Sequence, residues 1–185
     1  MPNNIRLQPM YLQSGDPETE NVATLLYPGM LGGRVTVKQP GPPGSPGAED
    51  YRFKTYQLVQ TDSSMAVAPF KGAVAFWSDK AKYLVTTTVT TLGRGRVAGV
   101  FQNAITPGYY GLIQTQGPAI VKFVDAPTTP PTAAGLIVIP SATAGKADCL
   151  AAGSAATYPA LGVSAGAYDA QNAQGVVDLD VLETP

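Results

Sequence analysis

The sequence predicts an all-β protein: a small β-barrel or sandwich of short antiparallel strands, preceded by an extended N-terminal arm. Three short apolar runs carry this prediction, at Arg96–Asn103, Tyr109–Thr115 and Ala119–Val124. The first break contains Thr106-Pro107-Gly108, in which Pro and Gly suit the second and third positions of a type II turn. The second break is Gln116-Gly117-Pro118. Short runs between Gly and Pro signals are typical of an antiparallel meander and not of helices.

Composition supports the same fold class. Gly and Pro together occupy 37 of 185 positions, which favours turns over long helices. Charged residues make up 14% of the chain, against about 25% in an ordinary globular domain. The length suffices for one domain with a substantial core. No run of 18 apolar residues and no apolar region near residue 1 are present, so we expect neither a transmembrane helix nor a Sec signal peptide.

Further strands are expected along the rest of the chain, each bounded by turn residues. In the last of them, Val177, Leu179 and Val181 form an inward row, and Asp178 and Asp180 an outward one. A short echo links Ala98-Gly99-Val100 to Leu161-Gly162-Val163, as expected for two hairpins of like construction. The expected strands are Thr55–Gln60, Ala73–Trp77, Lys82–Val89, Gly135–Ile139, Ala160–Ser164 and Gly175–Glu183.

We divide the chain into an arm with a Pro/Gly-rich linker, residues 1–50, and a β-barrel domain, residues 51–185, that folds without the arm. Asp16 and Pro17 combine an N-cap with a proline in the first helical turn, which predicts a short helix through about Tyr27. Arg34–Lys38 alternates like a short strand. Pro40–Gly47 holds too few Gly-X-Y triplets for a collagen helix and is interpreted as an exposed polyproline-like linker.

The residue types exclude several kinds of chemistry. The chain has no histidine, which removes Ser-His-Asp and Cys-His catalysis and imidazole metal sites. Its single cysteine, Cys149, forms no intrachain disulfide and is expected to be a small buried residue. Asp178 and Asp180, with Asp169, are too few to supply the oxygens of a calcium site, so we interpret them as solvent-facing. We therefore expect no enzyme activity, no metal and no cofactor.

Charge is unevenly distributed. Residues 34–122 hold ten basic and four acidic side chains, a net charge of +6, whereas residues 123–185 have a net charge of −5. This segregation serves to steer a negatively charged partner, to dock copies head to tail, or simply to pair segments within one fold. The basic residues Lys80, Lys82, Arg94 and Arg96 are interpreted as charges that protect strand edges from aggregation. A nucleic-acid site is the less favoured interpretation, because nucleic-acid-binding domains are usually basic overall and this chain is slightly acidic. We expect no nucleic-acid partner and no membrane.

Four motifs point to a known family: KGAVAFWSDK at 71–80, YLVT at 83–86, GRVAGVF at 95–101 and PGYYGLIQTQG at 107–117. In this order they resemble the capsid decoration, or cement, proteins of tailed bacteriophages. The resemblance is good over residues 55–125 and looser over residues 135–183, and residues 1–50 lie outside it. Because the motifs are turns and strands, the family supplies no catalytic residues.

The resemblance implies a structural virion protein that binds the outer face of a mature capsid, commonly as a trimer. Its partners would be the major capsid protein and further copies of itself. It would be made in the host cytoplasm and end on the capsid surface. A phage tail or fibre subunit involved in host-surface recognition is the alternative. Apolar residues of the arm are expected to contact the capsid or another subunit: Met10, Tyr11, Leu12, Leu25, Leu26, Tyr27, Met30 and Leu31.

Overall fold

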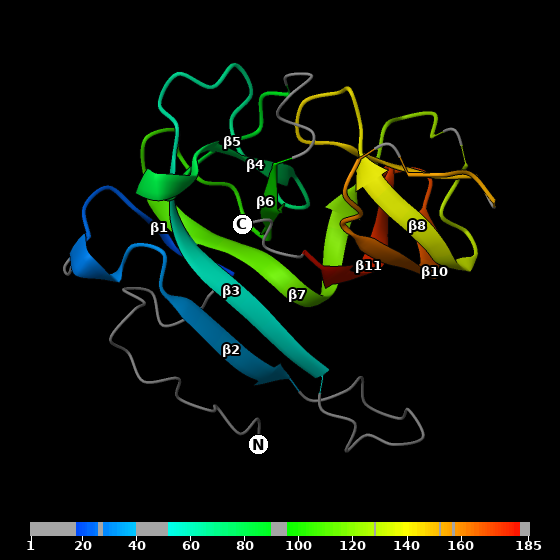
Figure 1. Cartoon of the computed structure of the whole chain (residues 1–185), viewed down its shortest axis with the longest axis horizontal. Helices are drawn as coiled ribbons and strands as arrows, with labels where there is room; N and C mark the ends of the chain where they lie inside the picture. Colours follow the sequence, from blue (N-terminus) through cyan, green and yellow to red (C-terminus); the bar gives the residue numbers. More distant parts are fainter. Residues whose placement is uncertain are drawn as a thin grey trace.

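A computed structural model gives the fold for residues 18–25, 28–39, 52–89, 96–127, 129–151, 153–156 and 158–181. The described chain is almost entirely β, which confirms the predicted class (Figure 1). The only helices in these ranges are two single 3₁₀ turns, Pro28–Met30 and Lys80–Lys82, and neither is long or apolar enough to cross a membrane. The strands are β1 (Asn21–Val22), β2 (Arg34–Gln39), β3 (Arg52–Thr61), β4 (Val74–Asp79), β5 (Leu84–Thr86), β6 (Val97–Phe101), β7 (Tyr110–Lys122), β8 (Ala134–Pro140), β9 (Ala147–Cys149), β10 (Gly162–Asp169) and β11 (Gln174–Asp180).

Five strands close into a barrel in the order β3-β5-β4-β6-β7, with β7 pairing back onto β3. All of these pairs are antiparallel except β3 with β5, which is parallel. Alternate residues of β4 fill the interior, because successive side chains of a strand point to opposite faces. The buried interior cluster is Val59, Ala73, Ala75, Trp77, Val85, Ala98, Phe101, Ile105 and Ile113.

The turn between β6 and β7 is the one that the sequence predicted. The amide of Tyr109 donates to the carbonyl of Thr106 at 2.9 Å, and Gly108 has a φ of +87°, as the third position of a type II turn requires. Val100 then pairs with Gln114 and Phe101 with Ile113. The hairpin prediction is therefore confirmed.

The predicted break at Gln116-Gly117-Pro118 is wrong, since β7 runs through it as one bent strand of 13 residues. Gly117 has a φ of +84°, and a Cβ there would lie 2.0 Å from the carbonyl oxygen of Phe53 on β3. The buried Gln114 amide nitrogen spans the inside of the bend and lies 3.0, 3.2 and 3.0 Å from the carbonyls of Gln116, Gly117 and Pro118. Gly and Pro thus bend the strand without ending it (Figure 1).

The second half of β7 belongs to a second sheet, in the order β7-β11-β10-β8-β9. One face of this sheet packs against the outside of β4 and β6, where Val74, Phe76 and Val100 supply the contact. The predicted inward row is confirmed, because Val177, Leu179 and Val181 are buried while Asp178 and Asp180 are exposed. Cys149 is buried in the same cluster, also as predicted.

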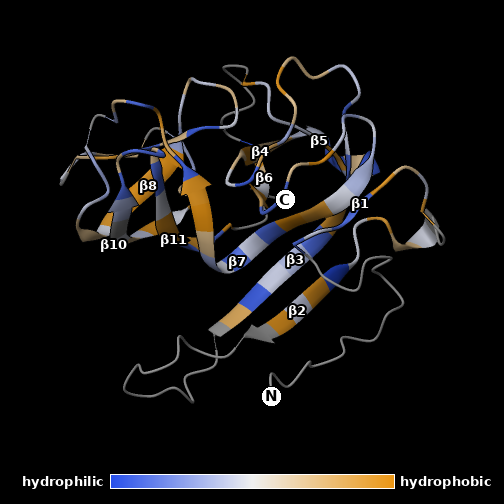
Figure 2. Ribbon diagram, turned by 180° about the vertical axis from the view of Figure 1, so that it is seen from behind, coloured by the Kyte–Doolittle hydropathy of each residue, from blue (hydrophilic) through white to orange (hydrophobic). Residues whose placement is uncertain are grey.

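The described part of the arm lies against the opposite wall of the barrel. β2 pairs with β3 over six residues, and β1 pairs with the start of β7. Leu25, Met30 and Leu31 pack on Tyr56, Leu58 and Leu112. Figure 2 shows the hydrophobic stretches of β2 lying beside β3. These contacts argue against separate folding of residues 51–185, which a truncation can test.

Two local predictions need correction. The helix expected from Asp16 is wrong over the described residues, because Glu18–Thr19 form a turn and Asn21–Val22 form a strand. The carboxamide oxygen of Asn21 accepts a hydrogen bond from the amide of Thr106 and so holds this strand in place. The strand expected over Lys82–Val89 is shorter. Asp79 caps a 3₁₀ turn and Tyr83 adopts a left-handed conformation, so pairing is limited to Leu84–Thr86.

Candidate interaction surface

Cys149 is a buried free thiol in the core beneath the second sheet. Burial, aided by the charge of Asp148, raises the pKa of the Cys149 thiol to about 12, so the nucleophilic thiolate is scarce at neutral pH. Within the described ranges no three acidic or cysteine side chains come close enough to hold a metal ion.

The apolar residues predicted as contacts fall into two groups. Leu25, Met30 and Leu31 are half-buried on their own barrel, which accounts for part of their apolar surface. Met10, Tyr11, Leu12, Leu26 and Tyr27 lie outside the described residues. Contact of either group with a capsid or another subunit stays a prediction.

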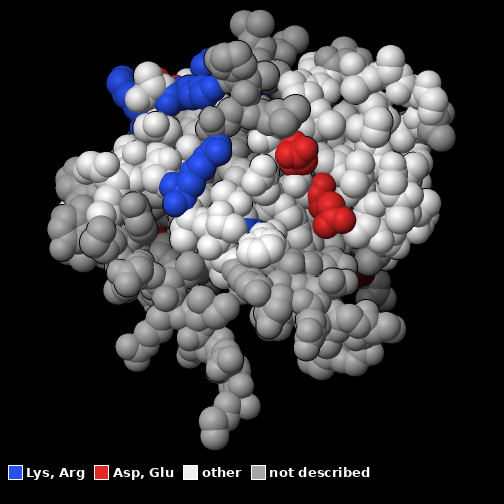
Figure 3. Space-filling model, turned by 60° about the horizontal axis from the view of Figure 1, so that its bottom comes forward, with Lys and Arg blue, Asp and Glu red and all other residues white. Residues whose placement is uncertain are grey.

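Lys80 and Lys82 lie in the 3₁₀ turn between β4 and β5, and Arg96 directly precedes β6. Lys82 makes an ion pair at 3.3 Å with Asp79, the residue that caps its 3₁₀ turn, and Arg96 is exposed. Arg94 lies outside the described residues. On the face shown in Figure 3, most of the visible Lys and Arg side chains of the described residues lie at the upper left, apart from the acidic groups.

The second sheet turns an apolar face outward, on the side away from the barrel. Ile137 of β8 and Val163 of β10 are directly paired and remain 39% and 43% exposed. The same cross-strand row continues through Asp178 of β11 to Pro118 of β7. We call the outer face the surface formed by Pro118, Ile120, Ile137, Val163, Val176, Asp178 and Asp180.

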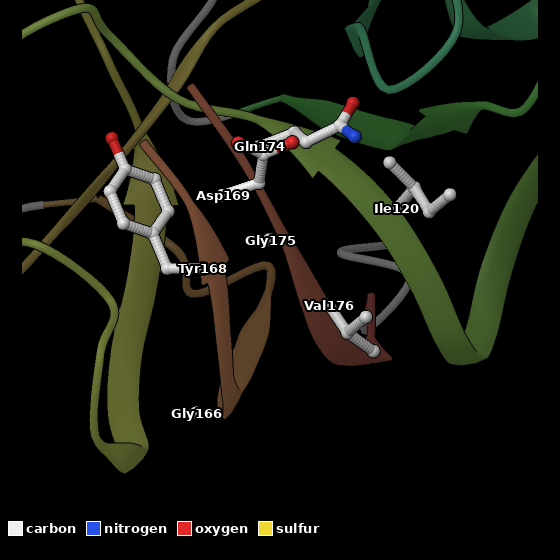
Figure 4. Close-up of a pocket in the computed structure, with 7 residues that line it drawn as sticks. All are labelled: Ile120, Gly166, Tyr168, Asp169, Gln174, Gly175 and Val176. Atoms are coloured by element: carbon white, nitrogen blue, oxygen red, sulfur yellow. The ribbon is translucent and has the colours of Figure 1, made fainter. Parts of the chain in front are cut away.

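A hollow of about 510 Å³ adjoins this row, and a strand irregularity explains it. Ser164 pairs with Val177 and Tyr168 with Gly175, so three residues of β10, 165–167, stand opposite the single residue Val176 of β11. The extra residues make β10 bow away from β11, as β-bulges do. Ile120 and Val176, paired across β7 and β11, give the hollow an apolar lining (Figure 4).

Polar groups line the end of the hollow near the β10–β11 turn. Both carboxylate oxygens of Asp169 serve that turn: Oδ1 accepts from the amides of Gln171 and Asn172, and Oδ2 accepts from the side chain of Asn172 at 2.6 Å. Hydrogen bonds from Asn172 hold the pKa of Asp169 below its ordinary value. Within the described chain, the Gln174 carboxamide and the Tyr168 hydroxyl have no hydrogen-bond partner, so both can bind a ligand atom.

Sequence reasoning missed the outer face. The strands around Ile137 and Val163 were predicted, but their outward residues were not. Ile137 stands between Leu136 and Val138, so alternation gave no direction, and Val163 precedes the polar Ser164, which is nevertheless the buried one of the two. The signal that was present is the pair Asp178 and Asp180, whose outward direction identifies the outer side of every strand in register with β11.

No family model and no curated protein matches this sequence. The fold and the surface together define an all-β protein with a closed barrel, a second sheet and an apolar outer face.

Proposed function

We propose that this chain is a structural virion protein that binds the outer surface of a phage capsid and stabilises it. The observation that carries the proposal is where the family-like motifs fall. Residues 71–80, 83–86, 96–101 and 107–117 form β4, β5, β6 and the first half of β7, which are four of the five barrel strands. The resemblance implied a small β-barrel, and its motifs occupy one.

The physical properties suit a cement protein. The barrel is closed and both its β3–β7 wall and its β4–β6 wall are covered, so the body is rigid enough to bridge neighbouring capsid subunits. Such a protein needs no chemistry and uses no cofactor. Weak individual contacts suffice, because many copies on a fixed lattice act at high effective concentration. Its partners are the major capsid protein and two further copies in a homotrimer.

Electron microscopy of particles assembled with and without this chain tests the proposal. Density repeated over the whole capsid, lost when the chain is omitted, is the expected result, together with earlier heat disruption of the undecorated shells. Density restricted to the tail would replace the proposal with the tail or fibre alternative, which the hollow beside Gln174 and Tyr168 would serve as a receptor site. No difference between the two particle preparations would reject both.

A further inference from the structure

The outer face is an apolar sheet surface with a hollow beside it, and the chain itself contains a segment that matches it. We propose that residues 1–15 of one copy bind the outer face of a neighbouring copy. This inference rests on the self-association in the proposed function and names the surface that mediates it.

The first argument is chemical complementarity. Residues 1–15, MPNNIRLQPMYLQSG, lie outside the described residues. They contain one basic residue, Arg6, and no acidic residue. The outer face carries Asp178 and Asp180, both exposed and without an ion-pair partner among the described residues. A segment with an isolated cation between apolar side chains fits an apolar face that bears two carboxylates.

The second argument is the pattern of apolar side chains. Ile5 and Leu7 flank Arg6, and Met10 and Leu12 flank Tyr11. In an extended segment, residues two apart lie on the same side. If the segment binds in an extended form, one such pair would cover the exposed row of Ile137 and Val163, and the other would reach the hollow lined by Ile120 and Val176. The free Gln174 carboxamide is placed to bind a backbone group of the inserted segment.

The third argument is direction, and it favours a neighbouring copy over the same copy. Glu18 Oε1 accepts hydrogen bonds from Lys54 Nζ at 2.8 Å and from Tyr56 Oη at 2.9 Å. Thr55 lies between these two residues and points to the other face of β3, where its hydroxyl donates to Gln116. Gln116 is paired with Asp180. The chain therefore reaches Glu18 on the face of the sheet opposite to the one that Asp180 occupies.

The symmetry is consistent with a trimer. A segment of one copy on a different surface of the next is a heterologous, head-to-tail contact, which closes into a ring when the rotation permits. In a ring of three, every segment is bound and every outer face is covered.

The first test uses a synthetic peptide of residues 1–15 and a chain lacking those residues. The deletion ends before Glu18 and so keeps every contact described above. We expect the peptide to bind, and Val163→Lys in the shortened chain to weaken binding about tenfold or more. The matched control is Val67→Lys, since Val67 is 37% exposed but lies outside the second sheet. Failure to bind, or equal effects of the two substitutions, would overturn the proposal.

The second test asks which copy supplies the segment. The shortened chain has a free outer face but no segment, whereas full-length Val163→Lys has a segment but a damaged face. Each alone should sediment as a monomer, and an equimolar mixture should form a 1:1 dimer, with circular dichroism confirming that both are folded. A mixture that stays monomeric would overturn binding between copies.

Charge reversal provides an independent check. Arg6→Glu should weaken self-association of the full chain, and adding Asp178→Arg and Asp180→Arg should restore it. If the second step restores nothing, the assignment of the segment to this face is wrong. Capsid decoration by the wild-type chain is measured separately, so a failed capsid function and a failed self-contact give different results.

Discussion

Gly117 is the residue on which the architecture depends, because β7 leaves the barrel and enters the second sheet at this point. Replacing it with alanine has two separate costs. A left-handed φ costs a residue with a side chain about 1–2 kcal/mol. The new Cβ would also lie 2.0 Å from the carbonyl oxygen of Phe53, so β3 and β7 must separate locally by about 1 Å. Overpacking of this kind costs about 1–3 kcal/mol.

Gly135 supplies the matched control. It has the same φ of +84°, but a Cβ there would meet nothing within 4 Å. Gly135→Ala should therefore cost only the conformational term, about 1–2 kcal/mol, whereas Gly117→Ala should cost about 2–5 kcal/mol. In a chain of this size each kcal/mol lowers the melting temperature by about 2–4 °C. Thermal unfolding followed by circular dichroism measures both; equal melting temperatures for the two variants would refute the role of the Phe53 contact.

Three further outcomes are expected. Removing residues 1–39 uncovers Tyr56, Leu58 and Leu112, each about 1% exposed in the full chain. The free energy of unfolding, measured by urea titration, should therefore fall by at least about 3 kcal/mol. An unchanged urea midpoint would show instead that residues 51–185 fold without the arm. Burial acts to raise the pKa of Glu18, but Lys54 and Tyr56 outweigh it and the pKa is lowered. The difference in free energy of unfolding between wild type and Glu18→Gln should thus be largest above the ordinary pKa of 4.5 and should shrink as pH falls through the lowered pKa. A difference that grows in acid would contradict this. Cys149, with its pKa raised to about 12, should react with Ellman's reagent at pH 8 about a thousandfold more slowly in the folded than in the unfolded protein, and comparable rates would show that the thiol is accessible.

The sequence determined the features that depend on neighbouring residues. The turn at Thr106-Pro107-Gly108 is set by the backbone preferences of Pro and Gly, so the β6–β7 hairpin was predictable. The inward direction of Val177, Leu179 and Val181 was predictable because polar residues alternate with them. The burial of Cys149 followed from its residue type. None of these depends on which strand lies alongside.

Only the tertiary structure decided how the strands combine. The same Gly and Pro that end a strand elsewhere merely bend β7, because β3 pairs with it up to Gln116, β11 pairs with it from Gln116 onward, and the Gln114 side chain bonds the carbonyls inside the bend. Closure of the barrel pairs Tyr56 with Gln114, residues far apart in the chain, and no local signal specifies it. The exposure of Ile137 and Val163 was hidden for a related reason. Leu136 and Val138 make both faces of β8 apolar around Ile137, so alternation gives no direction there. At Val163 alternation points the wrong way, because Ser164 is buried and its hydroxyl donates to the carbonyl of Pro131. The side left to solvent is fixed by which face of the sheet packs against the barrel.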